Sequence, residues 1–338
     1  MKNFLYSKTY EKHINIFIED DISKIIFNKY KDYFSSLIVL ESNLRDIFKT
    51  KNIKFIRSGK EAKSLDKFLD LSNIINKNKI SNLINFGGKE LLNLCGYTYN
   101  SVDFYKKLLI FIPTTLDSMI VPPLNGFFNL NMNFQENFLK VNGSPDFIYI
   151  DPKLLKENPK LRSKKSFIYP YFLGYLNNSK YSQLCVNYIK KNEKLDFHDF
   201  VLNGMSNSLS ILSSFEYFPG SRLKYKLFNK TYLFKNDIVD IDSVVYLFIS
   251  YLSFLNGQKI ESVYDLIRFI NYIGIDIKRI INNFDLSNNT RSFKEIILKN
   301  NHLKEIMITN QELKNYLDEF LIFIRGELFW VITQTRAL

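Results

Sequence analysis

The sequence is poor in the residues that most often bind metal ions or act as nucleophiles. Its 338 residues include three histidines, two cysteines and one tryptophan. Cys95 and Cys185 lie far apart in apolar segments, so they exclude a CxxC site and are typical of reduced core residues in a cytosolic protein. The histidines are also isolated from one another, at His13, His198 and His302.

Long apolar runs are absent as well. The longest, residues 244–255, contains serines and is too short to span a bilayer. Lysine, glutamate and histidine occur within the first dozen residues, so no signal peptide is visible. We therefore expect a cytoplasmic protein without a membrane segment.

Acidic residues are outnumbered by basic ones. The chain carries 46 Lys and Arg against 34 Asp and Glu, which gives a formal net charge of +12. Such an excess can indicate an anionic partner. The lysines are scattered along the whole chain, however, and form no basic stripe or recognisable binding module. We therefore do not expect a nucleic-acid partner.

The apolar pattern predicts two domains of different architecture. In the first half, short buried runs alternate with amphipathic helical periods, which favours an α/β, Rossmann-like domain with a parallel sheet. After Asp151-Pro152 long helical periods dominate, so a mostly α-helical domain is expected there. The predicted domains are 1–155, for nucleotide binding, and 156–338. The predicted strands are 37–40, 53–56, 83–86, 108–112 and 147–150, and the main predicted helices are 65–75, 202–212, 244–255, 260–273 and 313–324.

A polar segment follows one of these strands. The strand 108–112 runs into Pro113, whose ring fixes φ, and then into the hydroxyls of Thr114 and Thr115. A glycine pair, Gly87-Gly88, follows the preceding strand. Glycines at a strand end let backbone N–H groups approach a phosphate, especially where a helix begins next. The pattern favours a polar ligand at this edge of the sheet.

Further motifs between about residues 37 and 174 extend this pattern, in the order and nearly at the spacing of one enzyme family. They are Leu40-Glu41-Ser42-Asn43, Ser58 to Lys63, Asn85 to Gly88, Asn93 to Tyr97, Ile112 to Met119, Pro145 to Asp151 with Leu154-Leu155, and Pro159. On these motifs the chain resembles dehydroquinate synthase, the sugar phosphate cyclase of the shikimate pathway, which leads to chorismate and the aromatic amino acids.

The resemblance implies a function, a cofactor and a set of contacts. The family converts 3-deoxy-D-arabino-heptulosonate 7-phosphate to 3-dehydroquinate and releases phosphate, with NAD and zinc as cofactors. It also implies a homodimer and a phosphorylated keto-sugar acid as substrate. Lys89 replaces the third glycine of the family's turn. The residues implied in NAD binding are Glu41, Asn43, Lys63, Gly87, Gly88, Thr114, Thr115 and Asn137.

The metal ligands of the family, one glutamate and two histidines, are replaced. Their positions fall at Tyr169, Ser221 and Lys235. Aromatic rings do not bind Zn²⁺ and a lysine ammonium repels it, so we expect neither metal ligands nor retained catalytic residues. Other family positions are also substituted, with Val121 at an aspartate, Phe127, Glu136 and Phe172 at lysines, and Tyr225 at a further histidine.

Two other residue groups offer alternatives to the lost site. Asp237, Asp240 and Asp242, with Glu216 upstream, could bind a hard ion such as Mg²⁺ or simply form the acidic first turn of a helix starting near Ser243. The cations that could line a phosphate cleft are Arg222, Lys224, Lys226 and Lys235.

Three functions stay open. The first is a lyase, a dehydroquinate synthase that still turns over its substrate. The second is a non-catalytic relic or binding protein that keeps the fold and NAD binding, and the substitutions favour this loss of chemistry. The third is a relative of the iron-dependent alcohol dehydrogenases, but Leu116-Asp117-Ser118-Met119 fits the synthase better.

Overall fold

The computed structural model describes residues 14–48, 53–103, 105–121, 124, 126–158, 161, 163–177, 179–191, 193–215, 217–284 and 292–335. Contacts divide the chain into two compact units. The first is Met1–Thr114 with Pro122–Leu130 and Lys140–Asp151, and the second is Thr115–Val121 with Asn131–Leu139 and Pro152–Leu338. The division passes between Thr114 and Thr115, inside the segment that the sequence singled out. The predicted boundary near residue 155 falls within α5 (Lys153–Glu157), which belongs to the second unit.

The first unit is built on a six-stranded sheet in the order β1-β8-β5-β4-β2-β3. All pairings are parallel, as the alternating strands and helices predicted. The central strands are buried on both faces, which explains why they read as continuous apolar runs. The strands are β1 (Asn15–Ile18), β2 (Ser36–Glu41), β3 (Ile53–Ile56), β4 (Asn82–Gly87), β5 (Leu108–Pro113) and β8 (Phe147–Ile150).

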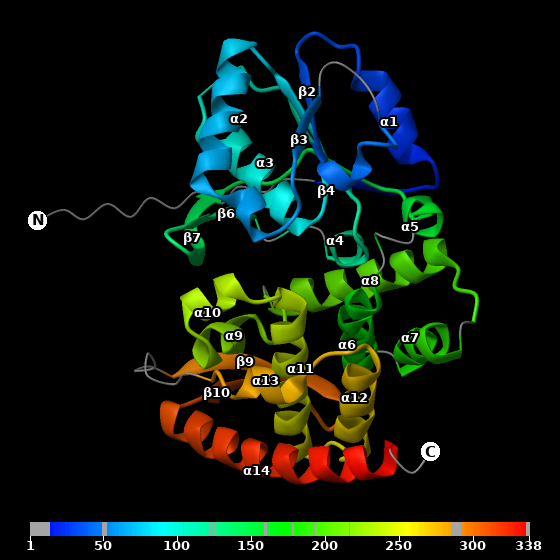
Figure 1. Cartoon of the computed structure of the whole chain (residues 1–338), viewed down its shortest axis with the longest axis vertical. Helices are drawn as coiled ribbons and strands as arrows, with labels where there is room; N and C mark the ends of the chain where they lie inside the picture. The colour runs from blue at the N-terminus through cyan, green and yellow to red at the C-terminus, as the bar shows by residue number, and fades with distance from the viewer. Residues whose placement is uncertain are drawn as a thin grey trace, which may run out of the picture. The chain divides into compact units, whose positions relative to one another are not determined.

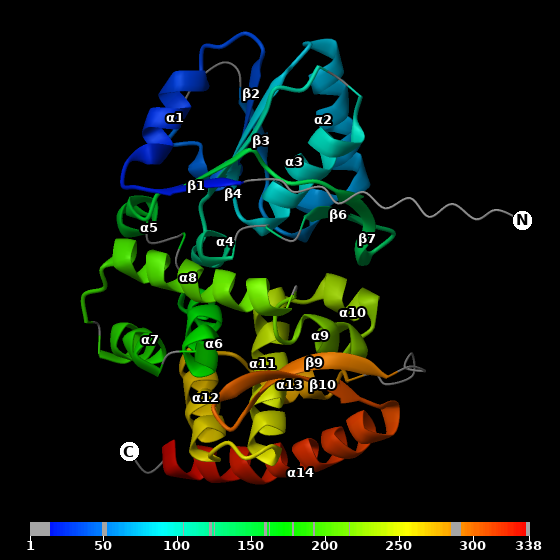
Figure 2. The same ribbon diagram turned by 180° about the vertical axis from the view of Figure 1, so that it is seen from behind.

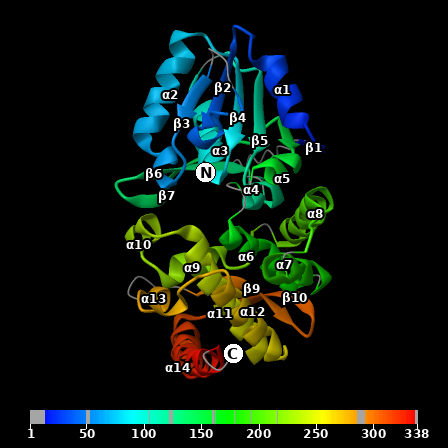
Figure 3. The same cartoon turned by 45° about the vertical axis from the view of Figure 1, so that its right-hand side comes forward.

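Helices cover both faces of this sheet. Helix α1 (Ile22–Tyr30) lies on one side and α2 (Leu65–Lys77) on the other (Figures 1 and 3). Helix α3 (Lys89–Ser101) packs against α2 and β4. Because the strands are parallel, the carboxyl ends of β2, β4 and β5 meet at one edge, where ligands bind in open α/β sheets.

Close packing explains a glycine on α3. A Cβ at Gly96 would lie 2.5 Å from the ring of Phe128, which belongs to β6 (Phe127–Met132). Strand β6 forms a two-stranded sheet with β7 (Gln135–Asn142). Asn133 and Phe134 both have positive φ, as a type I′ hairpin turn requires.

The second unit is mostly helical, as predicted. It contains an antiparallel hairpin that the sequence did not predict, formed by β9 (Phe293–Lys299) and β10 (His302–Ile308). Figure 2 shows this hairpin beside α11. Within the described ranges, no helix combines the length and the apolar character that crossing a membrane requires. The helices are α4 (Leu116–Ile120), α5, α6 (Ile168–Asn177), α7 (Ser179–Lys191), α8 (Phe197–Phe215), α9 (Ser221–Leu227), α10 (Lys230–Lys235), α11 (Ile238–Leu255), α12 (Glu261–Tyr272), α13 (Ile277–Ile281) and α14 (Asn310–Thr335).

The predicted start of one helix near Ser243 was wrong. Helix α11 begins at Ile238, and the Asp237 side chain caps it by accepting from Val239 N at 2.9 Å. The aspartates that follow therefore lie within the helix. The apolar period seen from Val244 onward marks only the buried part of a longer element.

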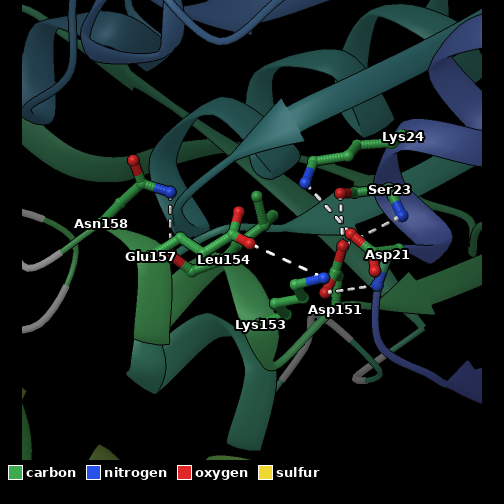
Figure 4. A network of polar contacts seen from close by, with 8 residues as sticks. All are labelled: Asp21, Ser23, Lys24, Asp151, Lys153, Leu154, Glu157 and Asn158. Carbon is green, nitrogen blue, oxygen red and sulfur yellow. Dashed lines mark hydrogen bonds and ion pairs between the residues drawn. The ribbon is translucent and has the colours of Figure 1, made fainter.

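A buried carboxylate ties the end of β8 to the start of α1. Asp151 accepts hydrogen bonds from the backbone N–H groups of Asp21, at 3.1 Å, and of Ser23, at 3.2 Å. The Ser23 hydroxyl donates to the same carboxylate (Figure 4). Burial raises the pKa of Asp151 above its usual value although these hydrogen bonds oppose the shift. The carboxylate thus satisfies N–H groups that have no partner within the helix.

Replacing Asp151 by alanine should therefore destabilise the protein. Asp151→Ala leaves two backbone N–H groups and a hydroxyl without their acceptor, which costs about 1–3 kcal/mol. Urea unfolding of the full chain measures this loss. Asp32→Ala, an exposed aspartate of the same unit, is the matched control and should change little. Equal stability of the two variants would contradict the capping role.

Candidate functional site

The glycine turn of the first unit connects β4 to α3. Strand β4 ends at Gly87, and Gly88 is the N-cap of α3. Glu41, the last residue of the neighbouring strand β2, is buried with 4% of its surface exposed. Its carboxylate accepts a hydrogen bond from Gly88 N at 2.9 Å. The N–H at the start of this helix is therefore a hydrogen-bond donor suited to an anion, and it is bound here by a carboxylate of the chain itself.

Gly87 is required by close packing at this turn. A Cβ there would lie 2.6 Å from Leu91 Cδ2 and 3.0 Å from Glu41 Cγ. The first distance is one that real side chains do not adopt. Any larger residue would push the first turn of α3 or the Glu41 side chain away from Gly88.

Thr114 completes the turn from the next strand. It follows β5, and its N–H donates to Gly87 O at 3.1 Å. The residue is fully buried, yet its hydroxyl finds no hydrogen-bond partner within the part of the chain that the structure describes. Buried hydroxyls are normally paired, so an unpaired one beside a glycine turn is a binding-site signal.

The other residues implied in NAD binding have different environments. Lys63 is buried, and its ammonium lies 2.8 Å from Glu90 Oε2 in the first turn of α3. Asn43 is exposed in the short helix η1 (Ser42–Leu44) that follows β2. Lys89, at the position of the family's third glycine, is half-buried.

Thr115 and Asn137 belong to the second unit. The Thr115 hydroxyl donates to Asp117 at 2.6 Å and lies 2.8 Å from Ser118 Oγ, within the cap of α4. The Asn137 amide donates to the Tyr225 hydroxyl. Direct contacts thus link Glu41, Gly87, Gly88 and Thr114 around one turn, and the neighbouring threonine serves as a helix cap instead.

The predicted metal-ligand positions lie in different environments. Tyr169 is buried against Phe218, with ring centroids 4.9 Å apart, and burial raises the pKa of its hydroxyl well above the usual range. The Ser221 hydroxyl donates to Phe218 O at 2.7 Å. Lys235 is exposed at the end of α10. A neutral phenol, a hydroxyl that already donates a hydrogen bond and an exposed ammonium are not ligands for Zn²⁺.

A partly buried ion pair lies in the same region and was not predicted as a pair. The Lys224 ammonium on α9 lies 2.9 Å from Asp242 on α11, with 12% of the lysine side chain and 26% of the aspartate side chain exposed. Burial alone would lower the pKa of Lys224, but the carboxylates of Asp242 and Glu136 outweigh burial and raise it. Lys224 is therefore a permanent cation in the interior of the second unit.

The aromatic neighbours of this pair complete its surroundings. Asp242 is close enough to Tyr169 and Tyr246 to raise the pKa of both hydroxyls, after burial, which is the larger cause. The Tyr246 ring stacks on Phe172 at a centroid distance of 4.0 Å. Phe172 and Tyr246 thus surround the pair with aromatic rings.

The other aspartates of α11 are also committed. Asp240 lies 2.7 Å from the Lys165 ammonium, and Asp237 caps the helix. Over the residues that the structure describes, no three His, Cys, Asp or Glu side chains are arranged to hold a metal ion. The reading of these aspartates as a helix turn with charge partners therefore fits better than the Mg²⁺ alternative. Pro159, Glu216 and His13 lie outside the described residues.

A second buried carboxylate, which the sequence did not indicate, fixes the start of α9. Glu295 on β9 accepts from Gly220 N and Leu223 N, each at 3.0 Å, and from its neighbour Ile296 N at 2.9 Å. Burial raises the pKa of Glu295 to about 6, although these N–H donors oppose the shift. The hairpin thus positions the helix that carries Lys224 and Tyr225.

Comparison of the sequence with protein-family models and with curated proteins gives no match. Solved structures match over most of the chain. The 2-epi-5-epi-valiolone synthase of Streptomyces hygroscopicus subsp. jinggangensis, solved with NAD⁺ and Zn²⁺, superposes with a TM-score of 0.69 at 11% identity, covering 93% of this chain and 98% of that one. A 2-deoxy-scyllo-inosose synthase with carbaglucose-6-phosphate, NAD⁺ and Co²⁺ gives 0.64 at 14% identity, with coverages of 90% and 96%.

The chain has the dehydroquinate synthase-like fold. The predicted fold class is confirmed, and the neighbours are sugar phosphate cyclases, as the motif resemblance indicated. An iron-containing alcohol dehydrogenase from Corynebacterium glutamicum superposes with a TM-score of 0.57 at 10% identity, covering 83% of this chain and 86% of that one. The dehydroquinate synthase-like fold is thus shared with that group of dehydrogenases.

The two cofactors of these neighbours fit this chain unequally. At the positions where the resemblance places the zinc ligands, Tyr169, Ser221 and Lys235 supply no ligand set, and the Lys224 ammonium in the same unit would repel a divalent cation. NAD fits better. The Gly88 N–H already binds a carboxylate oxygen, and the buried Thr114 hydroxyl beside it is unpaired within the described chain.

Removing the Lys224 charge should destabilise the protein. Lys224→Met leaves the Asp242 carboxylate, whose side chain is 26% exposed, without its ammonium, which costs about 1–3 kcal/mol, measured by urea unfolding. Replacing both members, Lys224→Met with Asp242→Leu, should recover most of that loss. Lys235→Met, an exposed lysine, is the control, expected to stay within about 0.5 kcal/mol. If Lys224→Met is as stable as that control, the Lys224 ammonium does not compensate the charge of the Asp242 carboxylate.

Glu295 should make stability depend on pH in mildly acidic solution. Its folded pKa of about 6 exceeds its ordinary value of 4.5. Its contribution to the free energy of unfolding is therefore fully present below about pH 4.5 and lost as the pH rises through about 6. The stability of the wild type relative to Glu295→Gln should fall by about 2 kcal/mol over that range. Glu261→Gln, at an exposed position, is the control. If the stability difference between the wild type and Glu295→Gln depends on pH as little as that between the wild type and Glu261→Gln, the titration of Glu295 is refuted.

Proposed function

We propose that this chain is a non-catalytic protein of the sugar phosphate cyclase lineage, which keeps the dehydroquinate synthase-like fold and a dinucleotide-binding turn. The observation that carries this proposal is the partly buried Lys224–Asp242 ion pair, 2.9 Å long, near Tyr169. The resemblance gives zinc the role of polarising the oxygen that is oxidised. An ammonium held among carboxylates repels a divalent cation and leaves that step without its Lewis acid.

NAD is the ligand that we propose for the first unit. The backbone N–H of Gly88 would bind a pyrophosphate oxygen at the start of α3. The Thr114 hydroxyl would donate to a phosphate or ribose oxygen. Bound NAD supplies hydride acceptor and donor chemistry, whereas these residues only bind and orient it.

An active dehydroquinate synthase of the shikimate pathway is the alternative. The motifs between residues 37 and 174 favour it, since they follow the order of that family. The tyrosine, serine and lysine at the ligand positions oppose it. We also propose a homodimer, which the resemblance implies. We propose a cytoplasmic location as well, because Cys95 and Cys185 are buried free thiols.

Binding without turnover is the expected behaviour of the purified chain. Millimolar NAD should raise the melting temperature, because a ligand that binds only the folded state stabilises it. Phosphate release from 3-deoxy-D-arabino-heptulosonate 7-phosphate, with NAD and added Zn²⁺ or Co²⁺, should stay at background. Turnover above background would overturn the loss of chemistry. An unchanged melting temperature in NAD would remove the binding claim alone.

A further inference from the structure

Glu41 and Gly88 meet because the two strands that carry them are neighbours. Leu40 of β2 is in register with Phe86 of β4, so Glu41 lies beside the end of β4. The glutamate side chain spans the remaining distance and places its carboxylate 2.9 Å from Gly88 N. With 4% of its surface exposed, Glu41 depends on protein donors in place of water.

This carboxylate occupies the Gly88 N–H that is proposed to bind a pyrophosphate oxygen. A phosphate oxygen bound to Gly88 N would lie at the same distance from the same N–H. Two anions at one donor repel each other, and an N–H group makes one good hydrogen bond. A dinucleotide therefore has to displace the Glu41 side chain before its pyrophosphate reaches the helix.

Two further contacts describe the same closed arrangement. The Lys63 ammonium, a cation suited to a phosphate, is 2.8 Å from Glu90 in the first turn of α3. Thr114 is joined to the turn by the hydrogen bond from its backbone N–H to Gly87 O. Its hydroxyl is buried without a hydrogen-bond partner among the described residues. The turn thus keeps a polar group that the internal carboxylate does not satisfy.

We propose that Glu41 is an internal competitor of the dinucleotide, so that its carboxylate lowers the affinity of the turn for NAD. This rests on the proposed binding of NAD. It opposes the role that the resemblance gives to an acidic residue at this strand end, which is to accept from ribose hydroxyls and so to raise the affinity. The two roles predict opposite effects of the same substitution.

Isothermal titration of the full chain with NAD separates these roles. Glu41→Ala frees the Gly88 N–H and should bind NAD roughly tenfold more tightly than the wild type, the factor that corresponds to losing a competing hydrogen bond from a charged acceptor. Glu41→Gln keeps the packing but lacks the charge, so its affinity for NAD should lie between those of the wild type and Glu41→Ala. This variant also serves if Glu41→Ala folds poorly.

Probes of different chemistry locate the effect on the ligand. ADP, which carries a pyrophosphate, should gain affinity as NAD does, whereas adenosine should bind the wild type and Glu41→Ala equally. Asp70→Asn, which removes an exposed charge on α2, is the matched control and should leave NAD affinity unchanged.

The outcomes are distinct for the competitor role and for NAD binding itself. Weaker or unchanged NAD binding by both Glu41 variants, with a wild type that binds, would overturn the competitor role alone. A loss of adenosine affinity in Glu41→Ala would do the same and favour the ribose role. No NAD binding by the wild type or by any variant would remove the proposed ligand and the competitor role together.

Discussion

The structure depends on pairs of opposite charges, which compensate each other where folding partly removes them from water. In the second unit the Lys224 ammonium and the Asp242 carboxylate meet among the rings of Tyr169 and Tyr246. Removing either charge would leave the other partly buried without its partner. A second aspartate of α11, Asp240, is paired in the same way with the ammonium of Lys165.

At the starts of three helices, buried carboxylates are in turn compensated by backbone N–H groups. Glu41 accepts from the N-cap N–H of α3, Asp151 from N–H groups at the start of α1, and Glu295 from N–H groups at the start of α9. Each carboxylate comes from a strand or strand end far away in the sequence, so each joins a helix to a sheet. Backbone N–H groups at a helix start attract any nearby anion. The first unit therefore offers its ligand donor to a side chain of its own before any nucleotide arrives.

The sequence predicted what local pattern and motif order can encode. Buried parallel strands are continuous apolar runs, so the sheet and the Gly87-Gly88 turn were identified. The edge strand β1, four residues long, and the hairpin β9–β10 were not predicted. The hairpin lies in a half of the chain where helical periods dominate, and its apolar runs, such as Ile296-Ile297-Leu298, do not by themselves distinguish a strand from a helix. The Lys224–Asp242 pair could not be separated from scattered surface charges, since only the packing of α9 on α11 buries it. The partner of Glu41 depends on strand neighbours and on a side-chain conformation, which no motif records.

The Glu295 cap has a consequence for how the second unit folds. Helix α9 is seven residues long, which is too short to persist by itself in water. Its first N–H groups are satisfied by a residue on β9, with a sequence separation of 75 between Gly220 and Glu295. The chain between them must close into a loop before the cap can form. During synthesis, the cap on α9 can therefore form only after β9 has also left the ribosome.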